Sequence, residues 1–353
     1  MRYIGNKENI LDKIYSILRE NGVEGDSFFD FFSGTTSVAR YYKKMGYRVF
    51  SSDFLYLSFC LQKAYIENNR APLFGRLLPT LPSVRCASFF ASPLEQVVAY
   101  LNTVSPVEGF IYKNYTPEGT AALDRPRMYF SSENGKVIDA IRIQIEKWKI
   151  EELITDSEYY ILLACLIETV SFYANVAGVY AAFQKKWDPR AIKPLTLRPI
   201  EIINNDRDNE VYNANSLDLV PGIDVDILYV DPPYNGRQYL PNYHLLETIA
   251  KYDSPSIHGV TGMRDYESKK SSFCNAKTAL KGIDYIASSA KFKYLVLSYN
   301  SEGIMNKADI MSTLSKYGTV KLEEFEYLRF KSNNNGLAKT QKHIFEQVYI
   351  LKK

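Results

Sequence analysis

Residues 28–36, Phe-Phe-Asp-Phe-Phe-Ser-Gly-Thr-Thr, place an apolar run directly before a loop of small residues. A short apolar run that ends in a turn signal is typical of a buried strand, which we expect over Phe28–Phe32. Ser33-Gly34 then lets the backbone approach a ligand closely, and the helix expected over Val38–Met45 offers free N–H groups at its start. A second strand is expected over Arg48–Ser52. This order of strand, loop, helix and strand predicts half of a doubly wound α/β fold.

The ends of these two strands carry acids that suit an adenosine-type ligand. Asp30 closes the first strand and could pair with a cationic amino group, while Asp53 closes the second, where acids commonly bind ribose hydroxyls. The loop lacks both the G-x-G-x-x-G pattern of dinucleotide sites and the G-K-S/T pattern of P-loops. A nucleoside with an amino-acid tail and no phosphate fits better, which describes S-adenosyl-L-methionine. An ordinary α/β turn without a ligand is the alternative.

A stiff corner follows a third apolar run. Residues 226–230 predict a buried parallel strand, and the Asp-Pro-Pro-Tyr corner (residues 231–234) comes directly after it. The two prolines remove two backbone donors and fix φ, which holds the chain extended. Asp231 and the Pro232 carbonyl can accept the two N–H groups of an exocyclic amino group, and Tyr234 can stack on the ring that carries it. A Pro-Pro turn that only ends a strand is the alternative.

The composition is that of an ordinary globular protein. The 353 residues are 46% hydrophobic and 24% charged, and the net charge of +3 excludes the strongly basic, histone-like class. The cysteines contain no C-x-x-C pair, so we expect neither a disulfide framework nor a metal site. They are Cys60, Cys86, Cys165 and Cys274.

We expect no membrane partner and a cytoplasmic location. The first residues contain no apolar segment of the kind found in signal peptides. Residues 159–183 are apolar, but Glu168, Ser171 and Asn175 lie in their middle, and a charge at the centre of a bilayer is costly. A helix expected over Glu158–Phe183 is therefore predicted to be buried in protein.

The order of three motifs resembles the D12 class of adenine-specific DNA methyltransferases, the Dam-like alpha group. These motifs are Tyr3-Ile-Gly5-Asn-Lys7, then Asp30-Phe-Phe-Ser33-Gly34, then the Asp-Pro-Pro-Tyr corner, and the resemblance covers roughly residues 1–60 and 205–353. It implies that Lys7 lies near the cofactor carboxylate and that Asp53 binds the ribose. Asn215 and Ser216 stand where many relatives have an Asp-Phe pair against the cofactor adenine. The cofactor-binding residues that it implies are Tyr3, Gly5, Lys7, Asp30, Phe32, Ser33, Gly34, Thr35, Asp53, Asn215 and Ser216.

The resemblance also implies an architecture. It predicts an α/β fold with a doubly wound, Rossmann-like methyltransferase sheet and a C-terminal antiparallel hairpin, for which strands over Val320–Arg329 and His343–Leu351 flank an Asn-Gly turn. The catalytic domain would comprise residues 1–70 and 205–353. Residues 71–204 would form an inserted, mainly helical recognition region. The helix over 158–183 belongs to either part.

The activity that the resemblance implies is methylation of adenine N6 in double-stranded DNA. A flipped-out adenine would enter the Asp-Pro-Pro-Tyr corner, with Asp231, Pro232, Pro233 and Tyr234 as the catalytic residues. The resemblance suggests a restriction endonuclease acting on the same DNA site as partner, and a solitary regulatory methylase without one is the alternative. An RNA adenine methyltransferase, a protein glutamine methyltransferase on the same fold and an inactive nucleic-acid-binding protein are the alternatives.

Two short segments are candidates for DNA contact. Lys185, Lys186 and Trp187 begin a basic run that could line phosphates, although a solvated helix end with favourable lysines is an equal alternative. Asn235 and Arg237 follow the Asp-Pro-Pro-Tyr corner in a polar loop, where they could reach a base edge and a phosphate.

Overall fold

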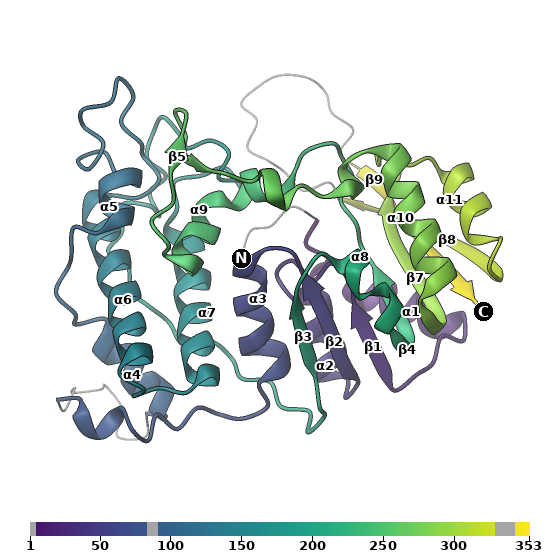
Figure 1. Ribbon diagram of the computed structural model, residues 1–353, viewed down its shortest axis with the longest axis horizontal. Helices are drawn as coiled ribbons and strands as arrows, with labels where there is room; N and C mark the ends of the chain where they lie inside the picture. The colour runs from purple at the N-terminus through teal and green to yellow at the C-terminus, as the bar shows by residue number, and fades with distance from the viewer. Residues whose placement is uncertain (1–4, 83–90, 329–342) are drawn as a thin grey trace. The chain divides into compact units, whose positions relative to one another are not determined.

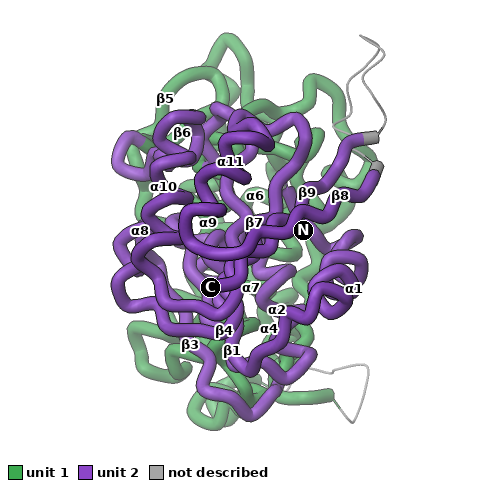
Figure 2. The backbone as a smooth tube through the Cα atoms, turned by 90° about the vertical axis from the view of Figure 1, so that its right-hand side faces the viewer, with its two compact units in different colours: residues 1–3, 63–203, 240–266 green, residues 4–62, 204–239, 267–353 purple. Residues whose placement is uncertain are grey.

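The chain forms two compact units. The computed structural model describes residues 5–82, 91–328 and 343–353. The sheet unit comprises Ile4–Gln62, Asn204–Tyr239 and Glu267–Lys353, and the helical unit comprises Met1–Tyr3, Lys63–Ile203 and Leu240–Tyr266 (Figure 2). Each unit is therefore assembled from segments that lie far apart in the sequence. The recognition role expected for residues 71–204 stays a prediction.

The sheet unit is built on one seven-stranded sheet. Its strands are β1 (Ser27–Asp30), β2 (Arg48–Asp53), β3 (Glu210–Asn213), β4 (Asp224–Val230), β7 (Lys291–Asn300), β8 (Thr319–Leu328) and β9 (His343–Lys352). Their order is β3-β2-β1-β4-β7-β9-β8, with the first five parallel and β9 antiparallel to both neighbours (Figure 1). The expected mixed α/β fold is confirmed. The expected Asn-Gly turn between β8 and β9 lies outside the described residues.

The strand order reverses beside β1. Strand β2 pairs with one side of β1 and β4 with the other, so the chain builds outward in both directions from this pair. Open α/β sheets bind their ligands at such a point, outside the carboxyl ends of the strands. The carboxyl ends of β1 and β4 carry Asp30 and, just beyond the strand, Asp231.

Strand β1 is shorter than expected, because it ends at Asp30 and not at Phe32. Phe31 donates its N–H to the carbonyl of Tyr229 at 3.0 Å, and Ser33 donates to that of Ser52 at 3.0 Å. The chain then turns through Gly34 at φ +51°. These bonds to two different neighbours pull the chain out of the strand before the helix that follows begins.

Helices and strands of the sheet unit share an apolar core. Its helices are α1 (Leu11–Glu20), α2 (Ser37–Lys44), α3 (Tyr56–Gln62), α8 (Ser216–Leu219), α10 (Ala276–Ser289) and α11 (Lys307–Leu314). Helix α1 buries Leu11, Ile14, Ile17 and Leu18, which form an apolar stripe along one face of the helix. Leu228 of β4, Leu295 of β7 and Ile283 of α10 pack into one cluster. Each such side chain contributes about 1.5–3 kcal/mol, which fixes the sheet edge where the acids lie.

The helical unit consists mainly of α-helices. They are α4 (Pro93–Leu101), α5 (Phe110–Tyr115), α6 (Ser132–Ile150), α7 (Asp156–Tyr173) and α9 (Tyr239–Lys251), and a small hairpin of β5 (Ile257–His258) and β6 (Met263–Arg264) follows. Thr155 caps α7 by accepting the N–H of Glu158, whose carboxylate in turn accepts from the N–H of Thr155. No described helix has the length and apolar character that crossing a bilayer would require.

Helix α7 ends earlier than the sequence pattern predicts. We expected a helix to Phe183, but α7 ends at Tyr173 and Ala174 is extended. Asn175 explains the break, because its N–H donates to the carbonyl of Tyr129 at 2.8 Å and its side-chain amide donates to that of Met128 at 3.0 Å. An asparagine that satisfies neighbouring backbone groups in this way stabilises a turn in place of the helix.

Candidate functional site

Two acids meet at the carboxyl edge of the sheet. The parallel register of β1 and β4 places Asp30 opposite Tyr229, which precedes Asp231 in the Asp-Pro-Pro-Tyr corner. Asp30 is buried and Asp231 is 13% exposed. Asp30 and Asp231 therefore lie at the carboxyl ends of adjacent parallel strands.

Lys7 lies between the Asp-Pro-Pro-Tyr corner and a third acid. Its ammonium Nζ is 2.6 Å from Oε1 of Glu346 and 3.5 Å from Oδ1 of Asp231, and it lies 4.7 Å from the ring centroid of Tyr234. The Tyr234 hydroxyl donates to the same Oδ1 of Asp231. Lys7 and Glu346 are buried, so this charge cluster is largely removed from water. A cation beside an aromatic face and two carboxylates is strongly held.

The chain before α1 brings Lys7 into this cluster. The N–H of Ile10 donates to the carbonyl of Lys7 at 2.8 Å, and Gly5 turns the chain with φ +79°. A Cβ on Gly5 would lie 3.5 Å from both the Tyr234 ring and the Tyr239 hydroxyl, and a side chain at this φ would be strained. Gly5 is thus suited to a close approach to the Asp-Pro-Pro-Tyr corner. Tyr3 lies outside the described residues.

Asp30 is incompletely satisfied. One of its oxygens, Oδ2, accepts the N–H of Ala39 at the start of α2 at 3.2 Å. The other, Oδ1, and the buried hydroxyl of Ser33 form no hydrogen bond of standard geometry with the described residues, and the interaction of Ser33 with this carboxyl opposes the rise in the Asp30 pKa. Buried polar atoms are rarely left unpaired in the absence of a ligand. The pair therefore fits the amino-acid end of a bound small molecule.

The carboxyls of the site hold their protons unusually well. Burial, together with the neighbouring Asp231 charge, raises the pKa of Asp30 to about 8. Burial also raises the pKa of Asp231 to about 7, with Lys7 opposing and Glu346 reinforcing this shift. Asp30, Asp231 and Glu346 thus face one ammonium, so the site would carry an excess of negative charge once these carboxyls ionise. Such a site favours a cationic ligand, because the ligand would supply the missing positive charge.

The other residues predicted to bind cofactor make contacts within the sheet unit. Asp53 accepts the N–H of Gly34 on Oδ2 and that of Leu55 on Oδ1, both at 2.8 Å. Ser216 is buried and donates its hydroxyl to the carbonyl of Phe31 at 2.8 Å. These bonds fix the loop that begins with Ser33. The ligand contacts predicted for Asp53 and Ser216 stay predictions.

Three further predicted residues surround this loop. Asn215 caps α8 by accepting the N–H of Leu217. The Phe32 ring packs edge-on against Phe273, with centroids 4.9 Å apart. Thr35 is buried directly before the start of α2. Their roles toward a cofactor also stay predictions.

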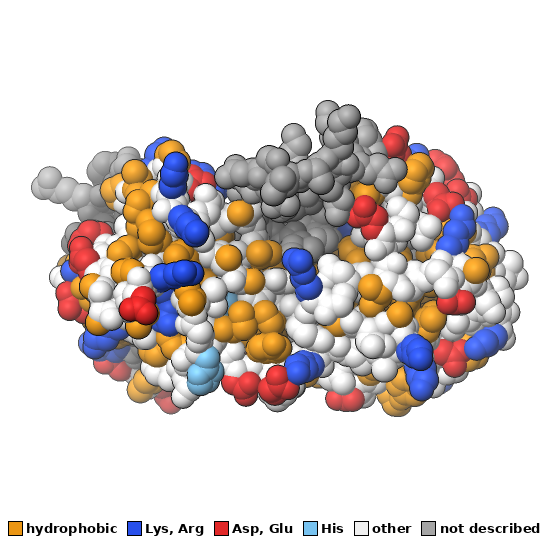
Figure 3. Space-filling view, turned by 90° about the horizontal axis from the view of Figure 1, so that it is seen from above, with side chains coloured by type: hydrophobic (Ala, Val, Ile, Leu, Met, Phe, Trp, Pro, Cys, Tyr) orange, Lys and Arg blue, Asp and Glu red, His pale blue; other side chains and the backbone are white. Residues whose placement is uncertain are grey.

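The residues predicted to contact DNA are divided between the units. Asn235 and Arg237 are exposed in the sheet unit, where the Asn235 side chain accepts the Arg237 N–H at 2.9 Å. Lys185 and Lys186 are exposed and Trp187 is half-buried in the helical unit. Because α7 already ends at Tyr173, the alternative that these lysines stabilise a helix end is wrong. The face in Figure 3 mixes basic and acidic side chains and shows no continuous basic surface outside the grey residues.

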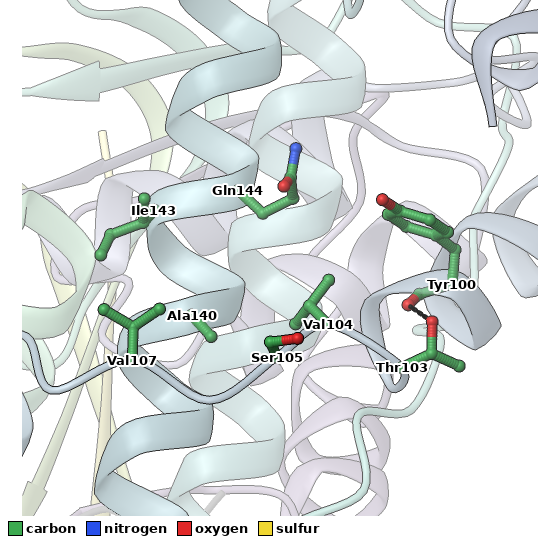
Figure 4. Close-up of a pocket in the computed structure, with 8 residues that line it drawn as sticks. All are labelled: Tyr100, Thr103, Val104, Ser105, Val107, Ala140, Ile143 and Gln144. Carbon is green, nitrogen blue, oxygen red and sulfur yellow. Dashed lines mark hydrogen bonds between the residues drawn. The ribbon is translucent and has the colours of Figure 1, made fainter. Parts of the chain in front are cut away.

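A pocket of about 400 Å³ lies in the helical unit, and none of its lining residues is a predicted site residue. It is lined by Tyr100, Thr103, Val104, Ser105, Val107, Ala140, Ile143 and Gln144 (Figure 4). These side chains include no charged group, and their polar groups are the hydroxyls of Tyr100, Thr103 and Ser105 and the amide of Gln144. The pocket therefore holds no carboxylate, imidazole or amine that could activate one of these hydroxyls. Among the described residues, no three His, Cys, Asp or Glu side chains gather as metal ligands.

Sequence reasoning missed Glu346 and its neighbour Ser298. Glu346 stands in the middle of the mostly buried strand β9, where an acid is out of place unless it has a partner. A glutamate in a buried strand was the sequence signal that could have identified this residue. The partner itself could not be inferred, because Lys7 lies at the opposite end of the chain.

Comparisons with known proteins agree with this geometry. A family model described as D12 class N6 adenine-specific DNA methyltransferase matches residues 3–313. Over the whole chain, 39% of residues are identical to Type II methyltransferase M.FokI of Planomicrobium okeanokoites and 35% to Modification methylase StsI of Streptococcus sanguinis. The chain spans about half of these two relatives, 53% and 52% of their lengths. It is 36% identical to Type II methyltransferase M.NlaIII of Neisseria lactamica, of which it covers 99%.

Proposed function

Because the chain belongs to the D12 class of N6 adenine-specific DNA methyltransferases, we propose that it transfers a methyl group from S-adenosyl-L-methionine to N6 of an adenine in double-stranded DNA. The observation that carries this proposal is the meeting of two features at one sheet edge. One is the buried Oδ1 of Asp30, and the other is the Asp-Pro-Pro-Tyr corner. The sheet would then be the doubly wound, Rossmann-like sheet of a methyltransferase, with β8 and β9 as its terminal hairpin.

Asp30, Ser33 and the loop after β1 would hold the cofactor. The Oδ1 of Asp30 suits an ammonium group, and a bound cation would favour the ionised form of this carboxyl, whose pKa burial raises to about 8. When bound, S-adenosyl-L-methionine supplies a methyl group on a positively charged sulfur. Asp53 would accept ribose hydroxyls only through lone pairs that its two backbone bonds leave available.

The Asp-Pro-Pro-Tyr corner would hold the target base. Asp231 accepts one N–H of the adenine amino group and the Pro232 carbonyl accepts the other, which directs the nitrogen lone pair out of the ring plane. Tyr234 presents a ring for stacking, a contact worth about 1–3 kcal/mol per base. Lys7 favours the ionised form of the Asp231 carboxyl, because its charge opposes the rise that burial causes in the pKa of that group. Holding the reactants in line provides much of the acceleration.

DNA recognition would involve the helical unit. The segment of Lys185, Lys186 and Trp187 lies in a loop beyond the end of α7. The two lysines therefore do not stabilise a helix end. Asn235 and Arg237 would add contacts beside the target base. The names of the relatives, which include modification methylases, support a restriction endonuclease with the same DNA site as partner. A DNA substrate makes the cytoplasm the proposed compartment.

A methyl-transfer assay tests the proposal. The purified chain is incubated with S-adenosyl-L-methionine carrying a labelled methyl group and, in parallel, with duplex DNA, RNA and protein substrates. We expect label in DNA, recovered as N6-methyladenine after digestion. Label in RNA adenine or in protein glutamine alone would replace the substrate. Absence of transfer to all three, with duplex DNA still bound, would leave an inactive nucleic-acid-binding protein.

A further inference from the structure

Glu346 makes the tightest contact of Lys7, although it lies outside the motifs of the site. It stands on β9, opposite Asn300 of β7 and Phe325 of β8, and is fully buried. Its Oε1 accepts Lys7 Nζ at 2.6 Å and also the hydroxyl of Ser298. Its Oε2 forms no hydrogen bond of standard geometry with the described residues, although the Tyr327 hydroxyl interacts with this carboxyl. Glu346 is therefore a buried acid that binds Lys7 through one of its two carboxylate oxygens.

The lysine is not shared equally between its two acids. Its ammonium lies 3.5 Å from Asp231, beyond the 2.7–2.9 Å of a good charge-assisted hydrogen bond, whereas the distance to Glu346 is that of a direct bond. Without Glu346, the attraction between Lys7 and Asp231 in a buried site would close this gap. Glu346 thus restrains the ammonium on its own side.

This restraint leaves part of Asp231 available. Both Lys7 and the Tyr234 hydroxyl approach Oδ1 of Asp231, and no hydrogen bond within the described residues uses Oδ2. We propose that Glu346 is a positioning residue, which holds the Lys7 ammonium away from Asp231 so that Oδ2 stays open to accept the amino group of the target base. This inference rests on the proposed function. Ser298 supports it by fixing the rotamer of Glu346.

The charged surroundings of Asp231 predict how removing the Glu346 charge acts. The negative charge of Glu346 raises the pKa of Asp231, and Lys7 lowers it. Replacing the charge by an amide removes the first effect and lets Lys7 approach, which strengthens the second. Both changes lower the pKa of Asp231. The titratable groups around this carboxyl are Lys7, Asp30, Tyr229, Tyr234, Tyr327 and Glu346.

The test compares wild type with Glu346→Gln, which keeps the volume and loses the charge. We expect kcat to fall roughly 10- to 100-fold, because a misplaced group costs about that much, with KM for DNA and for cofactor within about threefold. The acid limb of the kcat profile, measured between about pH 5 and pH 9, moves to lower pH. Glu346→Asp restores the charge and should return the limb toward its wild-type position. A purely structural role would lower the melting temperature without moving the limb.

Glu324→Gln is the matched control, since Glu324 lies on the neighbouring strand β8 and pairs with Lys307 at the surface. It should keep the wild-type kcat and limb. If Glu346→Gln fails to fold, Ser298→Ala removes only the supporting hydroxyl and should give a smaller loss with a limb shift in the same direction. Wild-type kcat and limb in the folded Glu346 or Ser298 variant would overturn the proposal. A wild-type enzyme that methylates no DNA would instead overturn the proposed function, and this inference with it.

Discussion

Two buried aspartates, one in each unit, differ in how completely their oxygens are used. Asp139 of the helical unit accepts from the N–H of Ile111 at 2.9 Å, the N–H of Tyr112 at 2.8 Å and the hydroxyl of Tyr252 at 2.6 Å. Asp30 of the sheet unit accepts one N–H, and its second oxygen forms no hydrogen bond of standard geometry with the described residues. Asp139 fixes the start of α5, while Asp30 is left incomplete. The satisfied acid is part of the scaffold, and the incompletely bonded one is the better candidate for binding a ligand.

The same contrast holds for the buried cations. Arg142 of α6 donates to the carbonyls of Ile249 and Ala250 and to the Tyr159 hydroxyl, and it pairs with Glu146. Lys7 has two acids but holds only one of them closely. Arg142 therefore anchors α9 to α6, whereas Lys7 belongs to a cluster with spare acceptors. Replacing residues on either side of this contrast should damage chemistry in one unit and stability in the other.

Asp231→Ala should give the largest effect. It removes an acceptor for the amino group at the Asp-Pro-Pro-Tyr corner, and we expect the rate of methyl transfer to fall roughly 1000-fold or more. Cofactor binding should persist, because Asp30 and its loop are untouched. The measurement is single-turnover methylation of duplex DNA, with calorimetric cofactor titration alongside. Asp284→Ala, which removes a surface acid paired with Lys316, is the control and should keep the wild-type rate. Normal turnover in Asp231→Ala would remove this residue from the mechanism.

Arg142→Leu should act on stability and not on the chemistry of the folded enzyme. It strands the carbonyls of Ile249 and Ala250 in a buried place, at a cost of about 2–3 kcal/mol in the free energy of unfolding. Urea unfolding measures this cost. Lys147→Leu on the same helix changes an exposed lysine and should leave the free energy of unfolding nearly unchanged. If the two variants are equally stable, a side chain with all its hydrogen bonds satisfied does not indicate a structural role in this protein.

Sequence reasoning found the parts of the sheet unit that depend on local pattern. The apolar runs before Asp30 and Asp231 predicted β1 and β4, and the pairing of these two strands in the structure brings both acids to one edge. It extended α7 too far, because residues 174–183 continue the apolar pattern and the break depends on bonds from Asn175 to Tyr129 and Met128. Such contacts are set by tertiary structure. They are invisible to periodicity.

The same limit explains the missed part of the site. Lys7 and Glu346 are 339 positions apart, so no spacing rule joins them. Only the pairing of β9 with β7 brings the acid to the edge. The sequence did contain the oddity of a glutamate in a buried strand, but the residue that it serves is defined by the fold.

Asp30→Asn tests this contrast through the pH dependence of the free energy of unfolding. Burial and the Asp231 charge raise the pKa of Asp30 from 3.8 to about 8, so the folded protein keeps a proton that the unfolded chain releases between these values. Stability should therefore fall as pH rises through this window, by up to about 1.4 kcal/mol per pH unit for one proton. Asp30→Asn should show a shallower fall in urea unfolding, with the contribution of Asp231 remaining. Asp218→Asn in α8 serves as the control.

Cofactor affinity in the wild-type protein should change with pH in the opposite direction to stability. A cationic amino group pairs best with ionised Asp30, so affinity for S-adenosyl-L-methionine should rise as pH increases toward 8, and Asp30→Asn should lower it roughly 10- to 100-fold. Calorimetric titration at several pH values measures both effects. An affinity that is independent of pH in wild type and unchanged in the variant would mean that Asp30 does not hold the cofactor.

The smallest effect is expected for exposed lysines, which do not belong to a buried charge cluster. Lys185 and Lys186 are exposed in the helical unit, and replacing both by alanine should weaken binding to duplex DNA about fivefold while reducing the slope of log affinity against log salt by up to about 2. Unfolding and cofactor affinity should stay unchanged, because no buried group loses a partner. Lys277 and Lys281 of α10 are also exposed, and their double alanine variant changes the charge equally in the sheet unit. If both double variants reduce the salt slope equally, DNA binding depends only on net charge. If only the Lys185 and Lys186 variant reduces it, the helical unit binds the phosphates while the sheet unit binds the base.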